Sequence, residues 1–87
     1  MRKAIFPGTF DPFTLGHQDM VSRALALFDQ LIIAIAQGSH KTPSITLDNR
    51  LLWVAECYAH EPRIKVLPLH GLLVDLAKEE QAQIHIS

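Results

Sequence analysis

Hydrophobic and polar residues follow one another in blocks of changing period, and these blocks predict an alternation of strands and helices. The short apolar run 3–6 is closed by a Pro-Gly pair, and the near-continuous apolar run 31–36 is typical of a strand covered on both faces. Between these two runs, the apolar residues of segment 20–28 recur at spacings of three and four, which predicts one face of a helix.

The second half of the chain continues this alternation. Thr46 is a plausible N-cap for a second helix, and Pro62 marks the end of that helix. A third strand over 63–69, a third helix over 72–82 and a fourth strand from Ile84 complete the pattern. The residues expected on the apolar side of the second helix are Leu47, Leu51, Leu52, Val54, Ala55 and Tyr58.

The predicted order is therefore β-α-β-α-β-α-β, which indicates an α/β fold with a parallel sheet and right-handed crossovers. The chain of 87 residues suits a single domain over 1–87. A chain of this size buries only roughly two-thirds of its unfolded surface, yet 48% of its residues are hydrophobic. This surplus predicts a missing partner, either a second subunit or the rest of a longer domain.

Charge and composition narrow the function classes. The formal net charge is −1 and no basic run carries interleaved aromatics, so nucleic acid is not an expected partner. No segment approaches the roughly 20 apolar residues of a membrane span, and we expect a cytoplasmic protein without a membrane partner. The single cysteine, Cys57, excludes an internal disulfide, and its place in an apolar helical pattern predicts a buried side chain.

The turn after the first strand has the features of an anion site, at the carboxyl edge where open α/β sheets bind ligands. Gly8 and Gly16 would let backbone N–H groups approach an anion closely. His17 opens the helix, where the dipole favours negative charge, and Thr9 and Thr14 add hydroxyls. The alternative is that the glycines only form a turn and that His17 only caps the helix.

Residues 7–12 read PGTFDP and residues 14–19 read TLGHQD. This combination resembles the signature of the nucleotidyltransferase superfamily with the (His/Thr)-x-Gly-His motif, and is close to that of bacterial phosphopantetheine adenylyltransferases. Further similarities to this family lie at 34–36, Lys41, Pro43 and the segment 46–50, TLDNR. The resemblance covers all of this chain but only about the first half of a family member.

The resemblance implies a Rossmann-like open sheet and transfer of AMP from ATP to 4′-phosphopantetheine, giving dephospho-coenzyme A and pyrophosphate. Mg²⁺ would accompany ATP, and family members are homo-oligomers, namely hexamers. The catalytic residues would be His17 and Lys41. ATP would be bound by Thr9, Phe10, Gly16 and His17, and phosphopantetheine by Thr9, Lys41 and Leu73.

Several of these residues have a structural alternative. Lys41 has the pattern of a solvated loop lysine, and Leu73 that of a core residue. Asp11 is expected to stabilise the turn through backbone N–H groups rather than to bind metal, and Arg50 to lie at the surface or in a salt bridge. The other histidines have no metal-ligand spacing, and we assign no metal site to this chain: His40, His60, His70 and His85.

Two features depart from the family. Gly71 stands where the family usually has an Asp, and the chain ends at Ser87, where the family continues into Arg-Gly-x-Arg. By the superfamily pattern the strand order would be 3-2-1-4-5, truncated here after the fourth strand, which would be left as an unpaired edge. We therefore expect impaired catalysis by this chain alone. The competing interpretations are a non-catalytic, nucleotide- or coenzyme A-binding or self-assembling remnant, and a related transferase that uses glycerol phosphate or nicotinamide mononucleotide.

Overall fold

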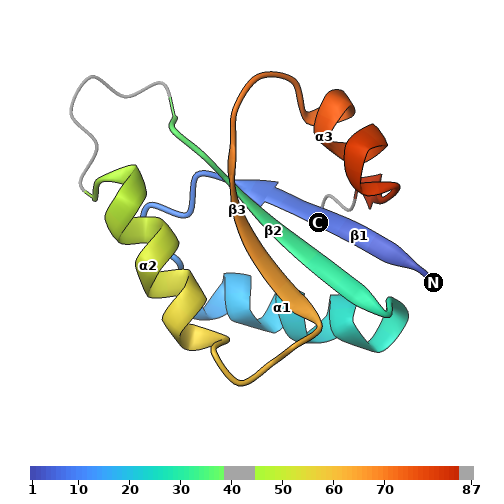
Figure 1. Ribbon diagram of the computed structural model, residues 1–87. Coiled ribbons are helices and arrows are strands. Elements are labelled where there is room, and N and C mark those ends of the chain that lie inside the picture. The colour runs from blue at the N-terminus through green and yellow to red at the C-terminus, as the bar shows by residue number, and fades with distance from the viewer. Residues whose placement is uncertain (39–44, 85–87) are drawn as a thin grey trace.

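The computed structural model describes residues 1–38 and 45–84, and it contains the expected elements in the expected order (Figure 1). These elements are β1 (Lys3–Gly8), α1 (Leu15–Leu27), β2 (Gln30–Ala36), α2 (Leu47–Cys57), β3 (Ile64–Leu69), α3 (Leu73–Glu80) and β4 (Gln83–Ile84). The predicted α/β alternation is confirmed.

The four strands form one parallel sheet in the order β3-β2-β1-β4. In the register of the sheet, Ile5 of β1 lies beside Ile32 of β2, and Ile33 of β2 lies beside Val66 of β3. This arrangement is a Rossmann-like fold with the strand order that the resemblance implied. The two central strands are covered on both faces, which explains their apolar sequences.

Helices cover both faces of the sheet: α1 and α2 lie on one side and α3 on the other (Figure 1). Side chains alternate between the faces along each strand, so neighbouring residues of β2 join different clusters. Ile33 packs with Val21 of α1 and Val54 of α2 on one face. Ile32 belongs to the cluster on the other face, against which Leu73 of α3 packs. Thr46 caps α2 as predicted, since its hydroxyl accepts from the backbone N–H of Asn49 at 3.2 Å.

Two predictions for α2 are wrong. Cys57 is exposed, and so are Leu52 and Ala55. Cys57 lies about 60° around the helix from the buried Val54, at the margin of the face that contacts the sheet. No helix in the described part of the chain is long and apolar enough to cross a membrane.

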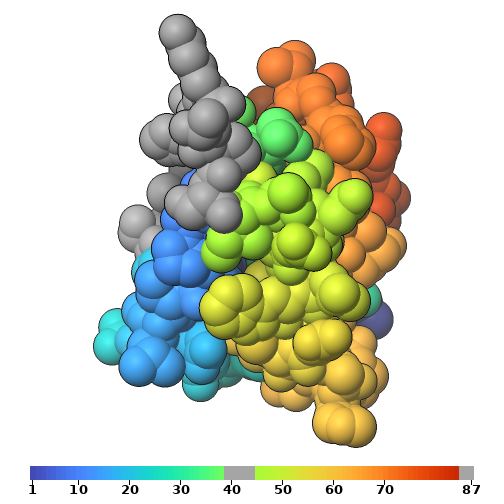
Figure 2. All heavy atoms as spheres, turned by 90° about the vertical axis from the view of Figure 1, so that its left-hand side faces the viewer, coloured from blue at the N-terminus to red at the C-terminus, as the bar shows by residue number. Residues whose placement is uncertain are grey.

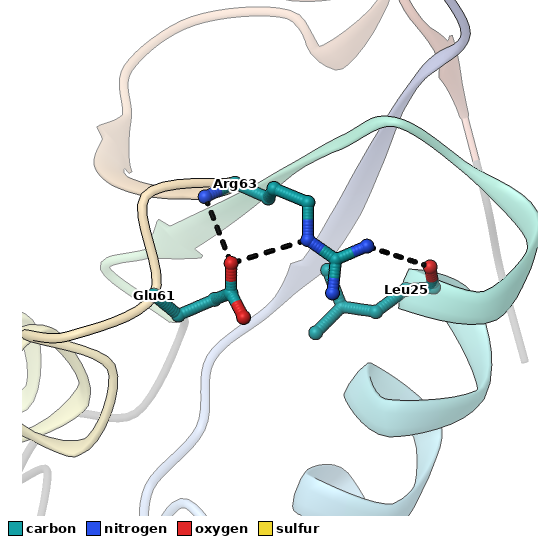
Figure 3. A network of polar contacts seen from close by, with 3 residues as sticks. All are labelled: Leu25, Glu61 and Arg63. Atoms are coloured by element: carbon teal, nitrogen blue, oxygen red, sulfur yellow. Dashed lines mark hydrogen bonds and ion pairs between the residues drawn. The ribbon is translucent and has the colours of Figure 1, made fainter.

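Arg63 links the connection between α2 and β3 to α1, just before β3 begins (Figure 3). Its backbone N–H and its Nε both donate to Oε1 of Glu61, each at 3.1 Å. Its Nη1 donates to the carbonyl of Leu25 near the end of α1, at 3.2 Å. The hydrogen bonds from Arg63 lower the pKa of the Glu61 carboxyl.

Candidate functional site

A hollow of about 470 Å³ lies at the carboxyl end of β1. It is lined by residues 6–12, from the end of β1 and the turn that follows, and by Thr14, His17 and Met20 at the start of α1. Figure 2 shows this turn, in blue, lying against the green and yellow α2. The hollow therefore lies where parallel sheets bind their ligands, and its walls come from the segment that carries the sequence motif.

Thr14 and His17 form a reciprocal cap at the start of α1. The backbone N–H of Thr14 donates to Nδ1 of His17 at 2.9 Å, and the backbone N–H of His17 donates to the Thr14 hydroxyl at 3.3 Å. Because a backbone N–H can only donate, Nδ1 accepts, and the proton of the neutral imidazole lies on Nε2. Among the described residues no group bonds Nε2, so the ring presents one N–H donor to a ligand.

The prediction that His17 opens the helix is inaccurate by two residues, because α1 begins at Leu15 and His17 is its third residue. His17 does take part in capping the helix, and the cap uses Nδ1 while Nε2 has no partner among the described residues. A Thr three residues before a Glu or Gln is the usual sequence signal of such a cap. Here His takes the place of Glu or Gln, which is why the signal was missed.

Aromatic side chains hold the imidazole of His17 from several sides. The ring of Phe10 meets it edge-on, with 4.9 Å between centroids, and the ring of Phe13 stacks on it at 5.6 Å. Phe13 also contacts Tyr58 of α2 at 6.1 Å, and burial raises the pKa of the Tyr58 phenol. The direction of the imidazole is therefore fixed by packing as well as by its hydrogen bond.

Gly8 leaves the space that the ring of Phe10 occupies. A Cβ at Gly8 would stand 2.8 Å from Cζ of Phe10, closer than real contacts allow. Phe10 itself has a φ of 50°, a left-handed conformation that is costly for an aromatic residue and that its buried ring holds in place. Gly16 differs, because a Cβ there would meet only the Thr14 hydroxyl at an ordinary 3.6 Å.

Arg50 is buried, against the prediction of a surface or salt-bridged residue. Its side chain is 1% exposed, and it bonds backbone carbonyls instead of a carboxylate. One of these carbonyls belongs to Thr9, in the wall of the hollow. Its positive charge, taken alone, predicts a position at the surface. Its spacing is informative, since Arg50 lies three residues after Leu47 and four before Val54, on the inner stripe of α2.

Asp11 also differs from its prediction. Its side chain makes no hydrogen bond to a described residue, and its buried Oδ1 has no partner there. The turn is therefore held by the contacts of Phe10 and Arg50, and Asp11 adds an acceptor to the wall of the hollow. No group of three or more His, Cys, Asp or Glu residues within 1–38 and 45–84 could hold a metal ion.

The structure brings together some of the predicted site residues. Thr9, Phe10 and His17 line the same hollow, and Gly16 lies beside them, exposed in the first turn of α1. Leu73 does not line this hollow; it begins α3 and packs on the opposite face of the sheet, half-buried. Lys41 lies outside the described residues, as do His40, Pro43 and His85.

A sequence profile of the cytidylyltransferase-like family matches residues 5–87. The chain is 45% identical over 82 residues to a phosphopantetheine adenylyltransferase of Flavobacterium johnsoniae, covering 94% of this chain and 54% of that relative. It is 52% identical over 79 residues to the phosphopantetheine adenylyltransferase of Coxiella burnetii, covering 91% of this chain and 49% of the relative. The chain spans about half the length of the curated relatives it matches.

Solved structures show the same fold at lower identity. A NadR protein in complex with NR matches with a TM-score of 0.73 and 24% identity, over 92% of this chain and 24% of that chain. A NadR protein in complex with NAD and AMP-PNP matches with a TM-score of 0.73 and 17% identity, over 99% of this chain and 37% of that one.

Proposed function

The chain belongs to the cytidylyltransferase-like family, and we propose that it binds ATP in the hollow after β1 and supports transfer of AMP to 4′-phosphopantetheine. The observation that carries this proposal is the Thr14–His17 cap, which leaves Nε2–H of an oriented imidazole without a partner among the described residues, in the lining of a hollow of about 470 Å³. The choice of acceptor rests on the two relatives named phosphopantetheine adenylyltransferase.

In the proposed reaction, a phosphate oxygen of phosphopantetheine attacks the α-phosphorus of ATP. The bond from that phosphorus to the bridging oxygen breaks, pyrophosphate leaves, and dephospho-coenzyme A carries the AMP. Negative charge builds on phosphate oxygens, and catalysis requires donors already placed to stabilise it. Nε2–H of His17 is such a donor, since its direction is set before the substrate binds.

Other residues of the turn would position the two substrates. The Thr9 hydroxyl would bind the phosphate of phosphopantetheine, and the backbone N–H of Phe10 would bind ATP. The first N–H groups of a helix lack intrahelical partners, so those around Gly16 would bind phosphate oxygens with the help of the helix dipole. Lys41 would add positive charge beside the transferring phosphate, and Leu73 would contact the pantetheine arm.

We further propose that Mg²⁺ enters bound to ATP, as part of the substrate, because the described residues offer no metal cluster of their own. The remaining proposals are a homo-oligomer, a cytoplasmic location, and residues 1–87 acting as one nucleotidyltransferase unit.

The decisive experiment measures pyrophosphate release from MgATP with 4′-phosphopantetheine, using His17→Ala, purified in parallel, as the control for contaminating host enzyme. Release that depends on His17 supports the proposal. Glycerol 3-phosphate and nicotinamide mononucleotide, tested as acceptors, identify a related transferase if either replaces phosphopantetheine. If no pyrophosphate is released, calorimetric titration with ATP decides between two outcomes. ATP binding without pyrophosphate release favours the non-catalytic alternative, and the absence of both ATP binding and pyrophosphate release overturns the proposed function.

A further inference from the structure

Arg50 is a buried cation that binds only main-chain carbonyls of the described residues. Nε donates to Ile45 at 3.0 Å and Nη2 to Gln37 at 3.1 Å. Nη1 donates to both Ala36, at 2.8 Å, and Thr9. A single side chain of α2 therefore connects three segments: the turn after β1, the end of β2, and Ile45, which precedes the N-cap residue of α2.

This arrangement needs the planar fork of a guanidinium. Its donors point outward in fixed directions within one plane, whereas an ammonium has only three donors on one nitrogen and cannot bond all four carbonyls. A buried charge is costly unless its hydrogen bonds are satisfied, and here backbone carbonyls accept from four of the five N–H donors without any carboxylate. The positively charged side chain therefore lies behind the turn that lines the proposed phosphate site. A positive charge there attracts the negatively charged phosphates.

The hydrogen bond from Arg50 to the Thr9 carbonyl also determines the direction of the backbone N–H of Phe10. The carbonyl of Thr9 and the N–H of Phe10 belong to one peptide plane, and among the described residues only the Asp11–Pro12 bond is cis. In a trans peptide the C=O and N–H point in opposite directions. Because Arg50 binds the carbonyl, the Phe10 N–H must point away from Arg50.

The other contacts hold this peptide against the connection that follows β2. Arg50 bonds the carbonyls of Ala36 and Gln37 there. Gly38, with a φ of 88°, lies next to Thr9, since a Cβ there would make an ordinary contact of 3.4 Å with the Thr9 methyl group. Arg50 therefore holds Thr9 in place relative to Ala36 and Gln37, at the end of β2.

We infer that Arg50 is a positioning residue of the nucleotide site: by holding the Thr9 carbonyl against the end of β2, it aims the Phe10 N–H at the phosphates. This inference rests on the proposed function for the identity of the ligand, but the orientation of the Thr9–Phe10 peptide can be measured without a ligand. The left-handed conformation of Phe10 persists only where its surroundings hold it, and Arg50 adds to the hold of the buried ring by fixing the preceding peptide.

The test compares Arg50→Lys with the control Arg23→Lys. Arg23 lies exposed on α1 in an ion pair with Asp19, and the control makes the same change of side chain. Thermal denaturation first identifies a temperature at which both variants are folded. At that temperature we expect Arg50→Lys to shift the amide resonances of Phe10 and Gly38 without ligand, and to weaken MgATP binding about threefold to thirtyfold. Arg23→Lys should change neither property.

A purely structural role would lower the melting temperature of Arg50→Lys while leaving the Phe10 resonance and the MgATP affinity of the folded protein unchanged, and this result would overturn the inference. If Arg50→Lys does not fold, the wild-type chain provides the test. MgATP should then protect the Phe10 amide from hydrogen exchange, and saturation without any effect on that amide would contradict the proposed orientation. If the wild type binds no MgATP, the proposed function fails, while the ligand-free resonances still decide whether Arg50 positions the turn.

Discussion

The backbone N–H of Thr14 donates to Nδ1 of His17 across 2.9 Å, and the Thr14 hydroxyl accepts from the His17 N–H at 3.3 Å in return. One pair of residues thus begins α1 and assigns the imidazole proton to Nε2. Helix capping, usually a contribution to stability alone, is here tied to the orientation of the proposed phosphate donor. Stability and ligand affinity should therefore change together when this pair is altered, but not when another helix is uncapped.

Replacing Thr14 by Ala tests that coupling. The variant loses an N-cap hydroxyl, and we expect its free energy of unfolding to fall by about 1 kcal/mol. We also expect its MgATP affinity to fall about threefold, the effect of one net hydrogen bond. The backbone N–H of residue 14 can still donate to Nδ1 of His17, but the hydroxyl that lies 3.1 Å from Nδ1 and caps the helix is lost, so the ring is less well oriented. Urea denaturation and calorimetric titration measure the two changes.

Thr46→Ala is the matched control, because Thr46 caps α2 through the N–H of Asn49 and does not line the hollow. It should lose a similar free energy of unfolding and keep its affinity for MgATP. Equal losses of affinity in both variants would mean that α1 capping has no special connection with the site.

The two glycines of the motif should respond in opposite ways to substitution by Ala. Gly8→Ala places a Cβ against the ring of Phe10, and overpacking of this kind costs about 1–3 kcal/mol of stability. Gly16→Ala meets only an ordinary contact in a helical position, so it should stabilise the chain by about 0.5 kcal/mol. If phosphate oxygens approach the first turn of α1, the same Gly16→Ala variant should bind MgATP more weakly. A stabilised variant with undiminished affinity would remove Gly16 from the proposed site.

The sequence predicted the sheet well because each element carries its own signal. The apolar run 31–36 and the helical spacing within 20–28 depend on local periodicity, and both correspond to elements at nearly the expected positions. The strand order required the resemblance, since nothing in the residues states which strands are neighbours. The boundaries at Leu15 and Gln30 differ by one or two residues from the expected ones, because capping and pairing extend each element beyond its apolar core.

The partners of Arg50 could not be predicted, because they come from distant segments, although its helical spacing places it on the inner side of α2. Arg50 is buried because carbonyls from three separate segments converge on it, and no local pattern predicts that convergence. Cys57 has an apolar sequence context but lies at the margin of the inner face of α2 and is exposed. For the candidate site, the motif located the turn, while the hydrogen bond that assigns the donor atom of His17 required the structure.

The exposure of Cys57 leads to a simple prediction. A thiol-specific reagent should modify one cysteine per chain in the native protein at close to the rate found in urea-denatured protein. Reaction only after unfolding would mean that Cys57 is covered in solution, for example by a second subunit over this part of α2. Cys57→Ser provides the blank for the assay.

The pair of Glu61 and Arg63 should give stability a small dependence on pH. Hydrogen bonds from Arg63 lower the pKa of Glu61 below its ordinary value of about 4.5, so the folded state favours the ionised carboxylate. This contribution is fully present above the ordinary pKa and is lost as the pH falls through the lowered value of the folded state. Both side chains are partly exposed, so added salt should weaken the effect.

Urea denaturation of the wild type and Glu61→Gln between pH 7 and pH 3 measures this contribution. The difference between the two midpoints should be largest near neutral pH and shrink at the acidic end. Glu79→Gln, at an exposed position on α3, serves as the control for removal of one negative charge. A difference that stays constant over the whole range would contradict the predicted linkage to Glu61.

The last prediction separates the two roles of His17 by comparing His17→Gln with His17→Ala. Gln at the third helical position is a usual partner in a reciprocal cap, so its side chain can still accept from the Thr14 N–H, whereas Ala cannot. Both variants lose the ring contacts with Phe10 and Phe13, and we expect His17→Gln to be more stable than His17→Ala by about 0.5–1 kcal/mol. Neither variant has an imidazole Nε2–H, so both should lose at least about tenfold in MgATP affinity or in pyrophosphate release. If His17→Gln matched the wild type in both assays, the cap alone would explain the histidine, and the phosphate donor would have to be sought elsewhere in the turn.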